Sequence, residues 1–209
     1  AKTFAGVEGI IGWQIDNELF PYDDGCFCED CKNGFRSYLR DKFGTTEKLN
    51  KAWGMARWSL EYISFEEIEP PYPNQWRHPS LRKAWWDYQC HLIKTFSDEQ
   101  ADILHKYGCS NIGTDMMPHN FLDYYAVNEK LDVVQYNHYD AADGLFRNVF
   151  AYDFLRCVKD KPFWVTETQV GWNGSEFAEC GYRPVGNCYV NTWLPIAKGA
   201  EMNLYWLGG

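Results

Sequence analysis

The sequence predicts an α/β fold with a parallel sheet, and among such folds a (β/α)8 TIM barrel fits best. Short apolar runs alternate with helical or loop segments, which is typical of parallel α/β sheets. Polar side chains recur where these runs end, and a TIM barrel builds its active site at the carboxyl ends of its strands. About five runs can be counted, whereas a closed barrel has eight strands in roughly 250 residues. We therefore expect an incomplete barrel whose first units precede Ala1.

The first predicted strand covers residues 9–16 and ends in Asp16-Asn17-Glu18. It reads as a buried strand whose carboxyl end carries function. Apolar residues then recur at helical spacing over 32–42, and Thr45 or Thr46 can cap a second helix that runs to about residue 53.

A stretch with four prolines, residues 66–79, predicts an extended loop. Ser80 is then the expected N-cap of a long amphipathic helix over 81–107, which Gly108 ends in a left-handed conformation. The remaining predicted strands cover residues 111–116, 132–138, 162–167 and 202–207.

Composition favours one soluble domain. The chain has 209 residues, a net charge of −9, and no basic cluster that could follow a phosphate backbone, so nucleic acid is not an expected partner. No apolar run reaches the roughly 18 residues of a membrane span. We expect a cytoplasmic protein without membrane contact. The 10 Trp, 14 Tyr and 13 Phe suit stacking on sugar rings, although core packing accounts for most of them.

Two glutamates at strand ends, Glu18 and Glu167, suggest glycoside hydrolysis. Retaining glycosidases use one carboxylic acid to protonate the leaving oxygen and one carboxylate to attack the anomeric carbon. If both residues lie at one barrel mouth, the charge of the nucleophile keeps its partner protonated. For either residue alone, a salt bridge or a solvated loop position is an equally good explanation. Asn17 can bond a sugar hydroxyl, and Trp172 can close one side of a sugar pocket or pack in the core.

Several segments resemble glycoside hydrolase family 42, the β-galactosidases. They are Trp-Gln-Ile-Asp-Asn-Glu at 13–18, the cysteine loop, Phe-Arg-Ser-Tyr-Leu at 35–39, Phe-Gly-Thr at 43–45, Leu-Asn-Lys-Ala-Trp-Gly at 49–54, and Trp58-Ser59 with Tyr62, Ile68 and Pro70. The resemblance spans nearly the whole chain. It implies that residues 1–209 are the C-terminal part of a TIM-barrel catalytic domain, roughly strands four to eight, with the N-terminal units and later domains absent.

The resemblance also implies roles. Glu18 is the acid/base, Glu167 is the nucleophile, and Asn17 and Trp172 bind the sugar. Tyr139 orients the nucleophile or touches substrate, while Asn137 stands where many relatives have Asp. The implied enzyme is a retaining β-galactosidase acting on β-galactosides or oligosaccharides, without a catalytic cofactor, and a homotrimer in the complete protein.

Three cysteines, Cys26, Cys28 and Cys31, form a tight group. The two-residue gap between Cys28 and Cys31 is typical of zinc loops, whereas the one-residue gap between Cys26 and Cys28 is not. A closed zinc site normally needs four ligands. The resemblance implies a fourth cysteine upstream of Ala1 and a structural zinc that stiffens the loop next to Glu18. The alternative is free thiols.

Other interpretations stay open. Another β-glycosidase, specific for glucosides, arabinosides or endo-glycans, would share Asn17, Glu18 and Glu167. A carbohydrate-binding module without turnover is the second class, and the presence of both glutamates argues against it. Four further polar residues near strand ends either line the site or serve structure, namely Asp115, His119, His138 and Asp140.

Overall fold

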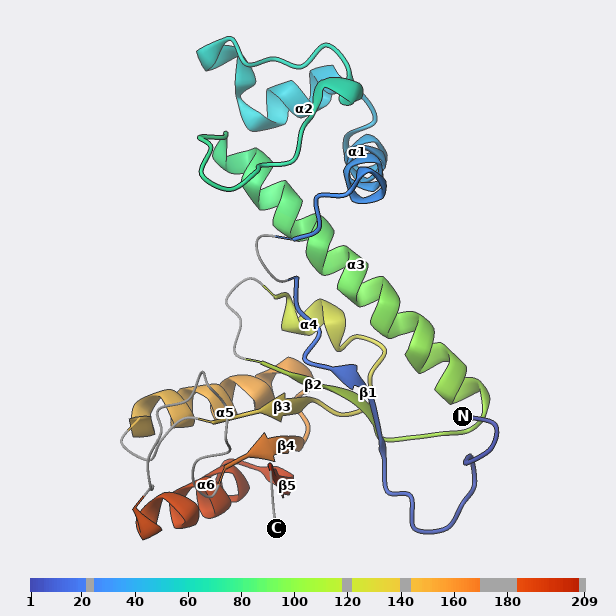
Figure 1. The fold of residues 1–209 in the computed structure, drawn as a ribbon, viewed down its shortest axis with the longest axis vertical. Coiled ribbons are helices and arrows are strands. Elements are labelled where there is room, and N and C mark those ends of the chain that lie inside the picture. The colour runs from blue at the N-terminus through green and yellow to red at the C-terminus, as the bar shows by residue number, and fades with distance from the viewer. Residues whose placement is uncertain (22–24, 118–121, 140–143, 170–183, 207–209) are drawn as a thin grey trace. The chain divides into compact units, whose positions relative to one another are not determined.

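The computed structural model describes residues 1–21, 25–117, 122–139, 144–169 and 184–206. It divides into two compact units. The sheet unit comprises Ala1–Phe20 and Ile93–Gly209, and the helical unit comprises Pro21–Leu92. Figure 1 shows the elements in chain order, which are β1 (Trp13–Asn17), α1 (Glu29–Phe43), α2 (Thr46–Trp53), the 3-10 turns η2 (Met55–Trp58) and η3 (Phe65–Glu67), α3 (Pro79–Lys106), β2 (Ile112–Met116), α4 (Tyr124–Val127), β3 (Gln135–Asn137), α5 (Leu145–Lys159), β4 (Phe163–Thr168), α6 (Val185–Ala197) and β5 (Ala200–Tyr205).

The sheet unit contains a five-stranded sheet in which every pair of neighbours is parallel. The strand order is β1-β2-β3-β4-β5, so neighbours in the sheet are also successive in the chain. A helix lies in each connection, and Figure 1 shows α4, α5 and α6 beside the sheet. This arrangement is the repeating unit of a barrel, and it confirms the expected α/β class.

All five predicted runs contain a strand, but the first prediction is wrong in its bounds and burial. The strand begins at Trp13, not at residue 9, and among its residues only Ile15 is buried. Ile10 and Ile11, which suggested a buried strand, precede it and are 41% and 65% exposed. In the described structure β1 pairs with β2 alone, so one edge of the strand has no neighbour that would cover these side chains.

A small core joins the ends of β1 and β2 to the last turns of α3. Its buried members are Ile15, Ala101, Leu104, Cys109, Ile112 and Leu131. These contacts hold β1 and β2 in position against α3, and so they also position the carboxyl ends of the two strands.

The caps of the helices agree in part with the sequence analysis. Thr45 caps α2, where its hydroxyl accepts from the Lys48 amide at 3.3 Å. The prediction of Ser80 as a cap is wrong, because α3 already begins at Pro79, a residue favoured at the first helical position. The His78 ring accepts from the Ser80 amide at 3.2 Å instead. Gly108 ends the helix with φ +76°, as expected.

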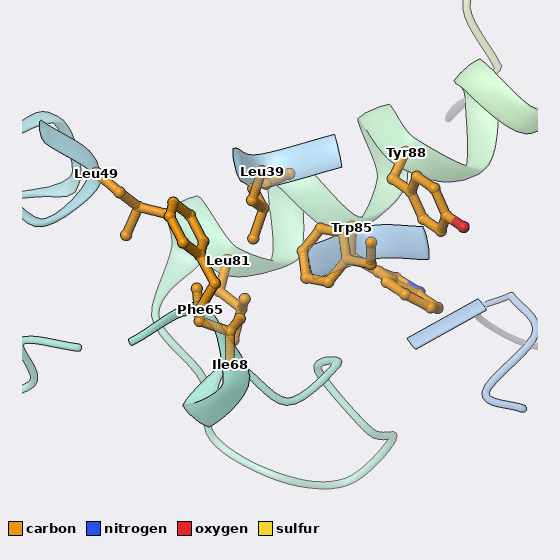
Figure 2. Close-up of a cluster of buried hydrophobic side chains, with 9 residues drawn as sticks. Leu39, Leu49, Phe65, Ile68, Leu81, Trp85 and Tyr88 are labelled. Atoms are coloured by element: carbon orange, nitrogen blue, oxygen red, sulfur yellow. The ribbon is translucent and has the colours of Figure 1, made fainter. Parts of the chain in front are cut away.

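Aromatic packing holds the helical unit together. Trp85 of α3 is 1% exposed and meets Phe35 of α1 edge-on, with 5.1 Å between ring centroids. Figure 2 shows this cluster around α3, which also includes Leu39, Leu49, Phe65, Ile68, Leu81 and Tyr88. Among the described helices, none has the length and apolar character that a membrane crossing requires.

Candidate active site

Four neighbouring strands bring polar side chains to one edge of the sheet. Glu18 directly follows β1, Asp115 lies near the end of β2, Asn137 ends β3, and Glu167 lies near the end of β4. The register pairs Asn17 with Asp115, and Asn137 with Glu167. The carboxyl ends of parallel strands thus gather residues that are far apart in the sequence, as a barrel active site requires.

Glu18 is held by both its backbone and its side chain. Its N–H donates to the main-chain oxygen and to Oδ1 of Asp115, at 3.1 and 3.2 Å. Asn137 Nδ2 donates to Glu18 Oε1 at 2.8 Å. Glu18 also has φ +50°, a left-handed conformation that is uncommon outside glycine and that local contacts have to stabilise.

Glu167 is half-buried, and its carboxyl group accepts a hydrogen bond from the Tyr139 hydroxyl. Burial is the main cause that raises the pKa of Glu167, and the charges of Asp115 and Glu18 raise it further, while the bond from Tyr139 lowers it. The charges of Asp115 and Glu18 thus favour the protonated form of Glu167. The expectation that the charge of Glu167 keeps Glu18 protonated stays a prediction.

Tyr139 follows β3 and is held in turn by its main chain. The side-chain amide of Gln169 donates to the Tyr139 carbonyl at 2.7 Å, and Asn191 of α6 donates to the Gln169 carbonyl at 3.1 Å. Burial and the contact with Glu167 raise the pKa of Tyr139, so its hydroxyl keeps its proton and remains a donor. This contact is compatible with an orienting role for Tyr139. That role and contact with substrate both stay predictions.

Asp115 and Asn137 are the two residues of this edge that sequence reasoning left undecided. Both side chains are fully buried. Asp115 Oδ2 accepts from Asn137 Nδ2 at 3.1 Å. Burial raises the pKa of Asp115, and this hydrogen bond opposes the rise. The feature that could have indicated a role for Asp115 is a carboxylate within β2, whose five residues are all buried. A buried charge needs partners, so such a residue is expected to take part in a polar network.

The remaining predicted residues differ in their outcome. Asn17 ends β1 beside Glu18 with an exposed side chain, as a substrate-binding residue would have. His138 is buried, and its Nε2 lies 2.8 Å from Asn148 Oδ1 of α5, in agreement with a structural role. Trp172, His119 and Asp140 lie outside the described residues.

In the helical unit, the ligand atoms of Cys26, Cys28 and Cys31 lie within 4.8 Å of one another. Cys28 is also the N-cap of α1, where its sulfur accepts from the Cys31 amide at 3.5 Å, and so α1 begins a turn earlier than predicted. Burial and the two neighbouring thiols raise the pKa of Cys31 to about 12. Three thiolates this close repel one another unless a cation joins them, so the donor set fits three of the four ligands of a structural zinc.

Comparison with known proteins decides the family. The sequence profile of glycoside hydrolase family 42, described as β-galactosidase, matches residues 1–207. The chain belongs to this family. Similar proteins include β-galactosidase YesZ of Bacillus subtilis, 30% identical over 209 residues, a match that covers 99% of this chain and 32% of that protein. A β-galactosidase of Thermus thermophilus is 30% identical over 236 residues, covering 98% of this chain and 35% of that protein.

Solved β-galactosidase structures have the same fold. The β-galactosidase of the haloarchaeon Halorubrum lacusprofundi superimposes with a TM-score of 0.86 at 29% identity, over 98% of this chain and 34% of that chain. The enzyme of Marinomonas ef1 gives a TM-score of 0.87 at 26% identity, over 98% and 35% of the two chains. The chain thus spans about a third of the length of these relatives. The five parallel strands form part of the family 42 barrel, which confirms the predicted fold class.

Proposed function

We infer that the full-length protein is a retaining β-galactosidase, with Glu18 as general acid/base and Glu167 as nucleophile. The observation that carries this proposal is the shared sheet edge, where Asn137 bonds Glu18, Asp115 accepts from the Glu18 N–H, and the charge of Asp115 raises the pKa of Glu167. Relatives that cover nearly all of this chain are β-galactosidases by name.

The first step transfers the sugar to the protein. A carboxylate oxygen of Glu167 forms a bond to the anomeric carbon while the bond from that carbon to the leaving oxygen breaks, and Glu18 gives its proton to that oxygen. In the second step Glu18 takes a proton from water, whose oxygen displaces Glu167 from the anomeric carbon and restores both carboxyl groups. Two displacements at one carbon retain the β configuration. Tyr139 holds the carboxyl group of Glu167, and Asn17 and Trp172 contact the sugar.

A 2-deoxy-2-fluoro-β-galactosyl inactivator with a good leaving group tests this proposal. The fluorine slows release of the sugar, so the covalent intermediate accumulates and peptide mapping locates the added mass. We expect the label on Glu167 in the full-length protein, and none in Glu167→Gln. A label elsewhere would contradict the assignment. Labelling only by the glucosyl or arabinosyl analogue would retain the mechanism and change the substrate.

We also propose a structural zinc held by Cys26, Cys28 and Cys31 together with one further ligand. The three sulfurs are close enough to share one ion. Bound zinc would crosslink the start of α1 to the segment before it, which stabilises the fold, and it takes no part in glycoside cleavage. Metal analysis of the purified protein tests this proposal, with one zinc per chain expected.

Two further properties remain predictions. A cytoplasmic location agrees with the described cysteines, which form no disulfide, and fractionation of cells tests it. A homotrimer follows from the family resemblance alone, and sedimentation of the full-length protein tests it.

A further inference from the structure

Between Glu18 and Glu167 lies a second pair of polar residues that the chemistry above does not use. Asp115 of β2 and Asn137 of β3 are both 0% exposed and joined at 3.1 Å. Fully buried polar groups are costly unless each finds a partner, so a pair that serves only folding would more simply be apolar.

The orientation of the Asn137 amide follows from its neighbours. The Thr166 hydroxyl of β4 donates to Asn137 Oδ1 at 3.2 Å, so the oxygen faces Thr166. The NH2 group then faces the two carboxyl groups, with one bond to Glu18 and one to Asp115. An amide in this position can donate to both carboxylates and cannot accept from either.

Asp115 reaches the proposed acid/base and the proposed nucleophile. It accepts from the Glu18 N–H through its main-chain oxygen and Oδ1. Asp115 and Glu167 lie near the ends of β2 and β4, the strands on either side of β3, and the charge of Asp115 raises the pKa of Glu167. One buried carboxylate therefore fixes the backbone of Glu18 and places negative charge beside Glu167.

We propose that Asp115 and Asn137 act as positioning residues that favour the charge states reached when the glycosyl–Glu167 bond forms. This inference rests on the proposed glycosidase function. In that step Glu18 becomes a carboxylate, which the Asn137 N–H stabilises by donating to it. Glu167 becomes an uncharged ester, which removes its repulsion with Asp115. The hydrogen bond from Asn137 to Glu18 and the electrostatic interaction of Asp115 with Glu167 are therefore both more favourable after the glycosyl–Glu167 bond forms than before. Interactions that strengthen in this way as the bond forms accelerate the step.

The size-matched variant Asp115→Asn separates this role from a merely structural one. Among the described residues, the groups that act on Glu167 are Asp115, Glu18 and Tyr139, and the charge of Asp115 raises the pKa of Glu167. Since attack requires ionised Glu167, the acidic limb of the kcat/KM profile follows that pKa. We expect the variant to lose roughly 10- to 10³-fold in kcat/KM near neutral pH, on the scale of removing one preorganised polar contact, while its acidic limb moves to lower pH.

The measurement uses an aryl β-galactoside and the full-length protein, with Asp153→Asn as the matched control. Asp153 is an exposed residue of α5 that pairs with Lys198, and its variant should keep the wild-type profile. An unmoved acidic limb in a folded Asp115→Asn would overturn the proposal. If that variant does not fold, Asn137→Asp tests the same bridge, because its added charge should move the limb to higher pH, and an unmoved limb overturns the proposal there too. Absence of turnover and of 2-fluoro labelling in the wild type would instead reject the glycosidase function itself.

Discussion

The Tyr139 hydroxyl donates a hydrogen bond to Glu167 Oε2, across the neighbouring strands β3 and β4. This bond opposes burial and the two nearby carboxylates, because it lowers the pKa of Glu167 while they raise it. A nucleophile in a partly buried site thereby has a contact that favours its reactive, charged form.

Tyr139→Phe removes that contact and leaves the ring. The pKa of Glu167 should rise, so the acidic limb of kcat/KM should move to higher pH, opposite to the shift expected for Asp115→Asn. Loss of one preorganised donor predicts a fall of roughly 10²- to 10³-fold in kcat. The control is Tyr125→Phe, at an exposed residue of α4. A limb that stays in place would show that the bond does not govern ionisation of Glu167.

Glu18→Gln keeps the shape of the side chain but cannot donate a proton as an acid. Turnover of alkyl galactosides should fall by roughly 10²- to 10⁴-fold. Formation of the intermediate from nitrophenyl galactosides should fall much less, because that leaving group departs without protonation. The comparison is made by single-turnover kinetics beside Glu201→Gln, an exposed glutamate of β5. Equal losses on both substrates would contradict the acid role.

Gly113→Ala should destabilise the sheet without touching a catalytic group. A Cβ at Gly113 would lie 2.6 Å from the Gln135 side chain and from the Val133 carbonyl oxygen, and the latter is backbone that cannot move freely. Overpacking of this kind costs about 1–3 kcal/mol, measurable by urea unfolding. Gly186→Ala is the control, because its Cβ meets nothing within 4 Å and it lies in α6, where alanine stabilises by about 0.5–1 kcal/mol. Similar effects of both variants would argue against the tight fit of β2.

Zinc removal should lower the melting temperature and leave the 2-fluoro label on Glu167. Binding stabilises by about 2.7 kcal/mol when free metal is a hundredfold above Kd, so a strong chelator should remove at least that much. Cys28→Ser should have an equally low melting temperature and no further response to chelator. The control Cys157→Ser, at an exposed thiol of α5, should respond to chelator as the wild type does. If chelation changed neither melting nor metal content, the zinc proposal would be wrong.

Local signals predicted much of the fold. Thr45 and Gly108 were found because a cap and a left-handed stop depend on a few adjacent residues. The predictions at Ile10, Ile11 and Ser80 were wrong because local periodicity shows neither that β1 pairs with β2 alone among the described strands nor that the His78 ring binds the Ser80 amide.

The site was predictable only in part for the same reason. Glu18 and Glu167 were recognisable by residue type and position at strand ends. The role of Asn137, however, depends on Thr166 to turn its amide and on the register that places Glu18 within reach. Such networks join residues from separate strands, and single-sequence patterns do not encode them.

Asp115, which accepts the hydrogen bond from the Glu18 N–H, limits how this site can be engineered. Because Asp115 fixes the main chain of Glu18 and its charge also raises the pKa of Glu167, a change at any of these strand ends affects the two proposed reaction steps together. A library that varies these positions would lose turnover before it gained a new sugar preference. Mutagenesis aimed at substrate choice should therefore keep Asp115 and Asn137 fixed and diversify the loops that follow the strands.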